Sequence, residues 1–243
     1  SQPFGYRLRT GLRQLPLLLL SSLLLMPLLV VFSSWLQPDW ALWQHLSSTV
    51  LSDYLQNSLL LAAGVGVGAL LIGTSLAWLL VFYRFPGRQL LQWLVLLPLA
   101  MPAYIIAYTY TGMLDFAGPV QTALRDTFGW RYGDYYFPQI RSLGGAVLLL
   151  SLVLYPYVYL LARTAFAAQS ARLAEASLSL GLSRRQHFFK VTLPMARPAL
   201  VTGMALAMME AFADYGTVQY FGVPTLTTGI FRTWFGMGQQ SGA

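Results

Sequence analysis

The sequence contains no cysteine, only two histidines and few charged residues. Asp, Glu, Lys and Arg make up 9% of its 243 residues, whereas soluble domains carry about 25%. The lack of cysteine excludes disulfide bonds, thiol catalysis and cysteine metal sites. His45 and His187 stand far apart in the chain, with no ligand cluster beside either. Neither histidine therefore supports a metal or catalytic site.

Hydrophobic residues make up 56% of the chain and form five long runs. About 20 apolar residues are needed to cross a hydrocarbon core as a helix. Each run must be helical in lipid, because every backbone donor and acceptor has to be satisfied within its own segment. The predicted spans cover residues 15–35, 58–82, 90–110, 143–165 and 199–220. The sequence therefore predicts an all-α membrane protein.

The first run is too long for a signal peptide, and no small-residue cleavage pattern follows it, so we expect an uncleaved anchor. After the fifth run, a polar segment from about Phe221 leads to Ile230–Phe235. We interpret the residues after 229 as the start of a sixth span. Because that span does not reach its full length, we expect the chain to be a fragment, with a helix bundle that is incomplete at its C-terminus.

Basic residues are distributed unequally between the two sides that these spans define. With the N-terminus in the cytoplasm, four of the 15 Lys and Arg residues lie outside and the other eleven inside, as the positive-inside rule requires. The eleven are Arg7, Arg9, Arg13, Arg84, Arg88, Arg163, Arg172, Arg184, Arg185, Lys190 and Arg197. The net charge of +7 thus reflects membrane orientation, and no basic stripe interleaved with aromatic residues suggests nucleic acid.

The predicted cytoplasmic loop 163–197 is too long and too patterned for a simple connection. Residues 165–180 favour a helix, and Gly181 suits the left-handed conformation that ends one. Ser183 and Gln186 have the spacing of a capping box at the start of a second helix, which mixes apolar and basic residues. This pattern fits a helix on anionic lipid, a helix docked into a partner protein, or a solvated hairpin.

The same loop resembles the EAA loop of binding-protein-dependent importer permeases, whose pattern is E-A-A, three residues, G, nine residues, I-x-L-P. Here Glu175-Ala176-Ser177, Gly181 and Val191-Thr192-Leu193-Pro194 follow that spacing, with Ser177 in place of Ala and Val191 in place of Ile. The resemblance implies a type I ABC importer (MetI-like) helix bundle in the bacterial inner membrane. It implies that this loop couples to the ATPase through Glu175, Ala176, Ser177, Gly181, Ser183, Leu193 and Pro194.

The resemblance also implies partners. These are ABC ATPase subunits, a second permease half, fused or separate, a periplasmic substrate-binding protein and membrane lipid. No Walker motif occurs, so we expect a transport subunit that is not an enzyme and binds no cofactor, while the partner subunit uses ATP. The glycine-rich run 64–68 lies inside an apolar span, where helix packing explains it better than a nucleotide loop.

Four further stretches, 97–104, 209–217, 220–224 and 227–232, resemble the ferric-iron branch of these permeases. Ferric iron is therefore the expected cargo. Permeases for thiamine, phosphonate and polyamine are built similarly and remain alternatives.

Glu210 and Asp214 lie within the fifth predicted span, four residues apart and so on one helical face. Ionisable groups at such positions usually face a bundle interior or a water-filled path, so both acids, with Tyr104, are candidates for the translocation path. The structural alternative is that Asp214 is hydrated at the interface and Glu210 is protonated or hydrogen-bonded between helices. An ion-coupled secondary transporter using both acids would need no ATPase, but would leave the EAA spacing unexplained. A membrane scaffold is a third class.

Tyr104, Tyr108 and Tyr215 lie near these acids in the predicted bundle and offer oxygen ligands suited to ferric iron. We nevertheless expect no metal site, because tyrosines near span ends usually anchor the membrane interface and a path must release its ion. We expect the outer cluster of Tyr132, Asp134, Tyr135 and Tyr136 to contact a binding protein or the headgroup layer.

Overall fold

The computed structural model describes residues 4–34, 40–131, 133–169, 177, 179, 181–236 and 238. Within these ranges the regular secondary structure is entirely helical. The chain divides into two compact units, Leu51–Gly229 and a smaller one made of Ser1–Val50 and Ile230–Ala243. An all-helical fold agrees with the apolar runs of the sequence.

The smaller unit contains α1 (Phe4–Ser34), α2 (Trp40–Thr49) and the π-helix η3 (Arg232–Gly236). Within α1, residues Pro16–Ser33 are long and apolar enough to cross a membrane, and none of them is buried against protein. Leu24, for example, is 71% exposed. A helix that exposes leucines on every side is suited to lipid, because large apolar patches are unfavourable in water.

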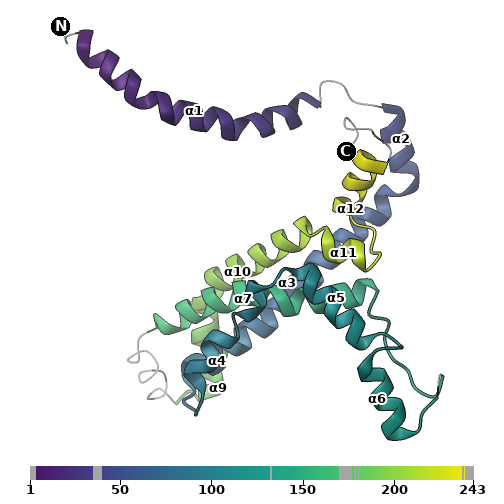
Figure 1. Cartoon of the computed structure of the whole chain (residues 1–243). Coiled ribbons are helices and arrows are strands. Elements are labelled where there is room, and N and C mark those ends of the chain that lie inside the picture. The colour runs from purple at the N-terminus through teal and green to yellow at the C-terminus, as the bar shows by residue number, and fades with distance from the viewer. Residues whose placement is uncertain are drawn as a thin grey trace. The chain divides into compact units, whose positions relative to one another are not determined.

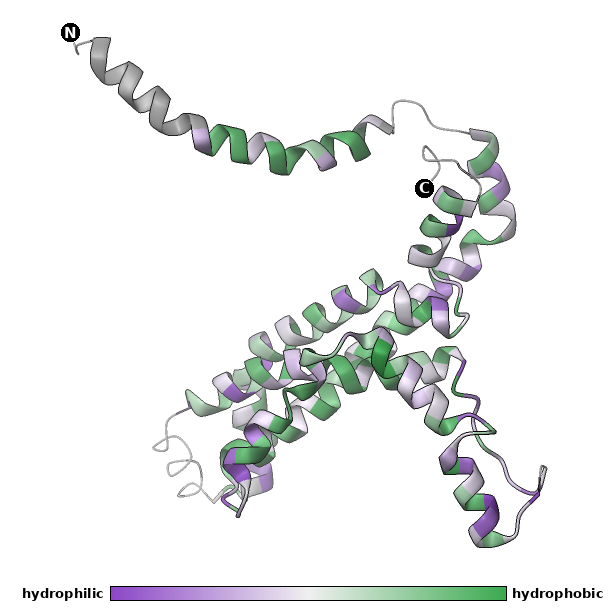
Figure 2. Cartoon of the chain, viewed as in Figure 1, coloured by the Kyte–Doolittle hydropathy of each residue, from purple (hydrophilic) through white to green (hydrophobic). Residues whose placement is uncertain are grey.

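Three long helices form the core of the larger unit. In Figure 1, α3 (Leu51–Phe82), α7 (Leu143–Ala167) and α10 (Leu193–Ala213) run side by side. Val65, Val158 and Ala207 are completely buried between them. Figure 2 shows that these helices are mainly hydrophobic, whereas α6 (Pro119–Phe128) carries more hydrophilic residues.

The close packing of these helices depends on glycine. A Cβ atom at Gly73 of α3 would lie 2.8 Å from the backbone oxygen of Tyr155 on α7, and one at Gly66 would lie 2.8 Å from Cγ of Met208 on α10. Small residues allow membrane helices to approach this closely. The glycine-rich run of α3 therefore packs helices, as its sequence predicted.

Residues 90–110, predicted as one span, are broken in the structure. The chain forms α4 (Arg88–Leu94), the 3-10 helix η1 (Leu97–Ala100) and α5 (Ala103–Leu114). The helical segments before and after Pro102 are bent by 97°. A residue that precedes proline is driven out of the helical conformation, and Met101 before Pro102 is extended, with φ −116° and ψ 133°. Pro102 thus divides the predicted span into two helical segments at a large angle.

Four described helices are long and apolar enough to cross a membrane, and the bent pair would be a fifth if it forms one span. The helix predicted over 199–220 begins earlier, at Leu193, and ends at Ala213. Two short helices follow it, α11 (Gly216–Tyr220) and α12 (Leu226–Phe231).

A hydrogen bond from α7 stabilises an earlier break in the bent region, between α4 and η1. The Tyr155 hydroxyl donates to the Val95 carbonyl at 2.8 Å, and both residues are buried. Leu99, whose N–H would bond that carbonyl in a continuous α-helix, donates to Leu96 instead. Tyr155 thus satisfies a carbonyl that the break leaves free.

We expect the substitution Tyr155→Phe to leave the Val95 carbonyl without this partner. An unsatisfied buried acceptor costs about 1–3 kcal/mol, so the melting temperature of the detergent-solubilised protein should fall. Tyr157→Phe on the same helix is the control, since no hydrogen bond of the Tyr157 hydroxyl is among those found in the described residues. Equal melting of the two variants would contradict the role of this bond.

Candidate functional site

The loop between α7 and α10 turns sharply at Gly181. This glycine has φ +87°, a left-handed conformation that side chains disfavour, and the Leu182 N–H donates to the Ser177 carbonyl at 3.2 Å across it. The left-handed corner predicted at Gly181 is confirmed. Glu175 and Ala176, the first residues of the EAA pattern, lie outside the described residues.

The capping box predicted after the corner is also present. The Ser183 N–H donates to Oε1 of Gln186 at 2.9 Å, and the Gln186 N–H donates to Oγ of Ser183 at 3.3 Å. The short helix α9 (Arg184–His187) begins directly after Ser183. These two bonds satisfy N–H groups that a helix start leaves free and make the corner locally rigid.

A π-helical turn joins the loop to α10. In η2 (Phe188–Thr192) the widened turn is closed by the Leu193 N–H, which donates to the Phe188 carbonyl. Pro194 follows and has no N–H to donate four residues back, which favours such an irregular turn. Leu193 and Pro194, both in the EAA pattern, thus form the first turn of α10.

An aromatic cluster holds this turn against the bundle. The Phe188 ring lies 5.1 Å from Trp78 of α3 and 6.2 Å from Phe166 of α7, measured between ring centroids. Phe166 is 1% exposed. Because aromatic pairs at this spacing attract beyond simple burial, the loop is anchored to two core helices.

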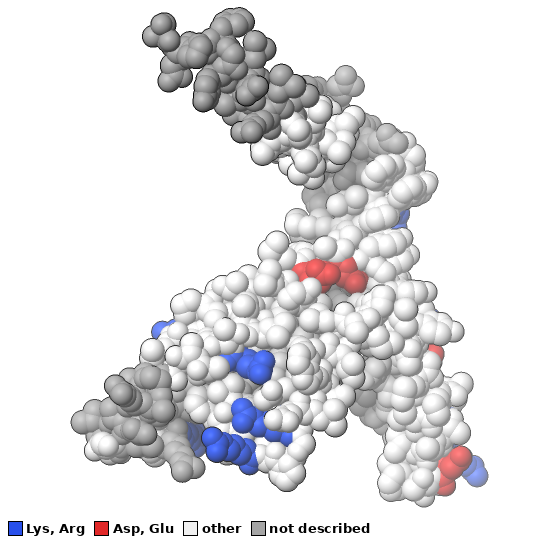
Figure 3. Space-filling model, turned by 60° about the vertical axis from the view of Figure 1, so that its left-hand side comes forward, with Lys and Arg blue, Asp and Glu red and all other residues white. Residues whose placement is uncertain are grey.

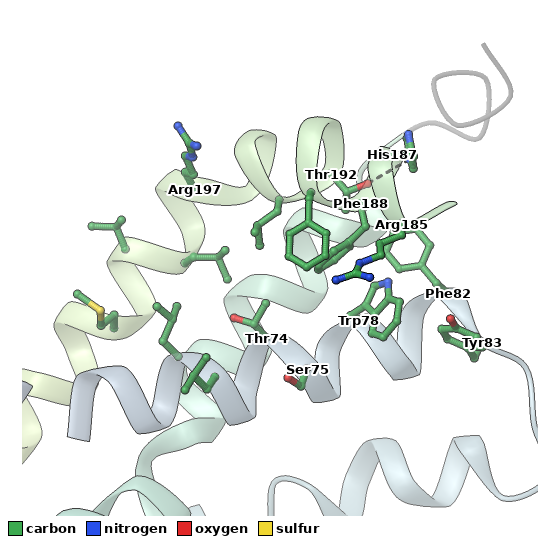
Figure 4. Close-up of a pocket in the computed structure, with 17 residues that line it drawn as sticks. Thr74, Ser75, Trp78, Phe82, Tyr83, Arg185, His187, Phe188, Thr192 and Arg197 are labelled. Atoms are coloured by element: carbon green, nitrogen blue, oxygen red, sulfur yellow. Dashed lines mark hydrogen bonds between the residues drawn. The ribbon is translucent and has the colours of Figure 1, made fainter. Parts of the chain in front are cut away.

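A largely apolar cavity of about 1100 Å³ lies beside the cluster, between α3 and the segment from α9 to α10 (Figure 4). Trp78, Arg185 and Phe188 line it together with Leu193. In Figure 4 the Arg185 side chain extends toward Trp78. The sequence assigned no role to Trp78 or to this cavity, because its walls come from segments more than 100 residues apart.

His187, to which the sequence also assigned no role, is held at both ring nitrogens. Its Nδ1 lies 2.6 Å from Oγ of Ser177, and its Nε2 lies 3.1 Å from Oγ1 of Thr192. The Thr192 carbonyl accepts a hydrogen bond from Nε2 of Gln169 at 3.0 Å. Ser177 and Thr192 are 6% and 1% exposed, so this network is mostly buried.

Basic side chains gather at the end of the larger unit where this loop lies. Figure 3 shows most of the Lys and Arg residues in view lying together, apart from the acidic residues. Arg88 at the start of α4 donates to the Leu80 carbonyl near the end of α3 at 2.6 Å, and Arg163 near the end of α7 donates to Gln92 at 3.2 Å. The ends of α3 and α7 therefore share a basic face with the loop.

The two acids of the predicted fifth span differ in their surroundings. Glu210 is exposed on α10, whereas Asp214 follows the last residue of that helix. The Asp214 carboxylate accepts hydrogen bonds from the N–H groups of Thr217 at 2.9 Å and Val218 at 3.2 Å, and from the Thr217 hydroxyl. The predicted continuous helix thus ends where Asp214 turns to cap the next one.

Tyr104 lies near the turn at Asp214. Its ring stands edge-on to Tyr220 at 5.9 Å, and Tyr108 lies at the same distance from Tyr220. The Arg141 guanidinium is 5.1 Å from the Tyr220 ring centre. The structure therefore brings Tyr104 beside the segment that follows Asp214. No group of three or more potential His, Cys, Asp or Glu metal ligands occurs among the described residues.

Several helices that are long and apolar enough to cross a membrane, with basic residues gathered at one end (Figure 3), are typical of a multi-pass membrane protein. Residues 69–237 match the family described as binding-protein-dependent transport system inner membrane component. The chain belongs to this family, and is the permease component of an ABC importer in the inner membrane.

Curated relatives include permeases for different cargoes. The molybdenum transport system permease protein ModB of Escherichia coli (strain K12) is 30% identical over 176 residues, covering 71% of this chain and 74% of ModB. The sulfate permease protein CysT of the same strain is 28% identical, over 83% of this chain and 70% of CysT. The Fe(3+)-transport permease protein FbpB 2 of Haemophilus influenzae is 27% identical, over 75% of this chain and 31% of its own length.

A solved structure has the same fold. It is a bacterial ABC transporter involved in the import of the acidic polysaccharide alginate, with a TM-score of 0.75 and 15% sequence identity. The alignment covers 98% of this chain and 89% of that one. The MetI-like bundle implied by the EAA resemblance is thereby confirmed, and the comparisons give no support to an ion-coupled secondary transporter.

Proposed function

We propose that this chain forms part of a substrate path and that its loop 163–197 docks onto a separate ATP-hydrolysing subunit. The observation that carries the proposal is the corner at Gly181, which is capped by Ser183 and anchored through Phe188 to α3 and α7. A docking element must be rigid if it is to pass on a displacement. Its position at the basic end of the bundle supports a cytoplasmic location for this loop and for the N-terminus.

The remaining partners follow from the family and the exposed surfaces. A second permease half, fused or separate, would complete the path, and a periplasmic binding protein would deliver the cargo. Lipid would cover the exposed leucines of α1 and α3, such as Leu24 and Leu71. The chain itself would bind no cofactor, and ATP would be consumed by the partner.

Recovery of an ATPase subunit tests the docking role. The full-length protein is purified from detergent-solubilised membranes beside a variant lacking residues 175–194. A variant lacking the outer helix α6 (residues 119–128) is the control for loss of a helical segment. We expect the ATPase to be recovered with the unmodified protein and the α6 variant only. Equal recovery with the 175–194 deletion, or none with the unmodified protein, would contradict the docking role.

Ferric iron is the cargo we propose. Support comes from the stretches that resemble the ferric-iron branch and from the similarity to FbpB 2. The phenols of Tyr104 and Tyr108 and the carboxylate of Glu210 are hard oxygen groups near one end of the bundle, of a kind that ferric iron prefers. Weak, successive contacts with such groups would allow the ion to pass.

An oxyanion is the second candidate. Arg141 lies over the Tyr220 ring in the same region, and a guanidinium attracts anions and repels metal cations. ModB and CysT are named for molybdenum and sulfate transport. Uptake of radioactive ferric citrate, molybdate and sulfate by cells with and without the full-length protein separates the two candidates. Uptake of either oxyanion without iron would contradict the iron proposal.

The two acids should respond differently to substitution. We expect Glu210→Gln to lower uptake several-fold without changing the melting temperature, because Glu210 is exposed and bears no structural hydrogen bond among those described. We expect Asp214→Ala to lower the melting temperature, because a lost helix cap costs about 1 kcal/mol. Unchanged uptake in Glu210→Gln would contradict a place for Glu210 in the substrate path.

A further inference from the structure

The imidazole of His187 connects two segments that the Gly181 corner separates. Ser177 lies before the corner and bonds Nδ1, whereas Thr192 lies at the entrance to α10 and bonds Nε2. The Gln169 side chain, which also precedes the corner, donates to the Thr192 carbonyl and joins the same two parts of the chain. We propose that His187 is a positioning residue. Its two hydrogen bonds form a clamp that joins the loop at Ser177 to the start of α10 at Thr192, so that movement of the loop moves α10. This inference rests on the proposed docking function.

The chemistry of the clamp suits a permanent connection. A neutral imidazole has one N–H donor and one acceptor nitrogen, and a hydroxyl can both donate and accept. Ser177 and Thr192 therefore satisfy both nitrogens in either tautomer, and both hydroxyls are largely buried. Buried polar groups without partners cost free energy, so the two hydroxyls and the ring favour staying together when the loop is displaced.

The clamp continues into the bundle at two further points. Phe188, the next residue after His187, lies in the aromatic cluster with Trp78 and Phe166. The Thr192 carbonyl accepts from Gln169, just after the end of α7. Thr192 itself directly precedes α10, the helix that carries Glu210. A displacement of the corner at Gly181 thus has a short, hydrogen-bonded route to a helix of the proposed path.

The lack of native cysteine allows a direct test. Leu59→Cys on α3 and Leu206→Cys on α10 are exposed positions, 60% and 40%, for a pair of spin labels. The distance between the labels is measured in the full-length protein bound to its ATPase, without nucleotide and with MgATP and vanadate. We expect a nucleotide-dependent shift in the otherwise unmodified protein and its loss in His187→Leu. His187→Gln, which retains a donor and an acceptor, should restore part of the shift.

One further variant is a control, and another is a second test of the clamp. His45→Leu removes the other histidine, which is exposed on α2, and should leave the shift unchanged. Thr192→Val removes one hydroxyl with little change in shape and should reduce the shift even if His187→Leu fails to fold. Recovery of the ATPase with each variant and its melting temperature are measured in parallel.

The outcomes separate this inference from the function on which it rests. A full shift in both His187→Leu and Thr192→Val, with the ATPase bound, would overturn the clamp and leave the docking role intact. Loss of ATPase binding in His187→Leu would overturn it too, since His187 would then shape the docking surface itself. Failure of the unmodified protein to bind any ATPase would overturn the docking function together with the clamp.

Discussion

Replacing Gly181 by valine is expected to reduce substrate uptake at least fivefold while the protein still inserts into the membrane. Gly181 has φ +87°, and a Cβ atom added there meets no atom of the described residues within 4 Å, so the expected effect comes from the backbone conformation. A left-handed conformation costs an ordinary residue roughly 1–2 kcal/mol, and more when the residue is β-branched. A strain of this size changes the ratio of two conformations about 5- to 30-fold. Here it would shift the corner from its docking geometry toward other conformations.

The measurement is uptake per ATP hydrolysed in membranes containing the complete transporter. Gly129 provides a matched control, because it also has a left-handed backbone, with φ +68°, and open space around an added Cβ, but it follows α6 and is not part of the loop before α10. Gly129→Val should carry similar strain and leave the coupling of uptake to hydrolysis unchanged. Equal coupling in the two variants would show that the corner does not transmit the ATPase movement.

Replacing Gly73 by valine is expected to prevent normal packing of α3 against α7. An added Cβ would lie 2.8 Å from the Tyr155 oxygen, the Tyr159 nitrogen and the Val158 Cβ. Two of these atoms belong to the backbone, so no side-chain rotation can relieve the contact and the helices must separate. Overpacking of this kind costs about 1–3 kcal/mol, and valine adds more atoms to the same contact than alanine. We expect little monodisperse protein from Gly73→Val and a lowered melting temperature for Gly73→Ala.

The control for this substitution is Gly112→Ala on α5. Gly112 is exposed, and an added Cβ would meet nothing within 4 Å. Alanine is favoured over glycine inside a helix by about 1 kcal/mol, so this variant should melt at the same temperature as the unmodified protein or higher. If Gly73→Ala melts like Gly112→Ala, the α3–α7 interface does not require glycine at position 73.

The features that the sequence predicted best depend on neighbouring residues. Apolar runs long enough to cross lipid identified the helical regions, because the backbone must satisfy its own hydrogen bonds there. The capping box of Ser183 and Gln186 and the left-handed Gly181 are also local, since each involves residues at most three positions apart. The spacing of the EAA loop, a pattern along one short segment, was enough to indicate the importer family.

The features that the sequence missed or misjudged depend on contacts between distant segments. The apolar run predicted one span over 90–110, but the chain bends by 97° at Pro102, and before that bend the Val95 carbonyl accepts a hydrogen bond from the Tyr155 hydroxyl, 60 residues away. The spacing of Glu210 and Asp214 predicted that both lie on one helical face. In the structure the Asp214 carboxylate accepts hydrogen bonds from the N–H groups of Thr217 and Val218 and so caps α11. An aspartate can bond nearby backbone groups as readily as it can remain in a helix.

The sequence by itself determined that this protein is a helical membrane permease with a capped corner in the loop before α10, because hydropathy, helix caps and motif spacing act over a few turns of chain. Only the tertiary structure decided which side chains surround that corner. Trp78 and Phe166 meet Phe188, and Ser177 and Thr192 bind opposite sides of His187. The aromatic contacts require separate helices to pack at a particular distance and rotation, and that arrangement depends on close approaches such as Gly73 against Tyr155.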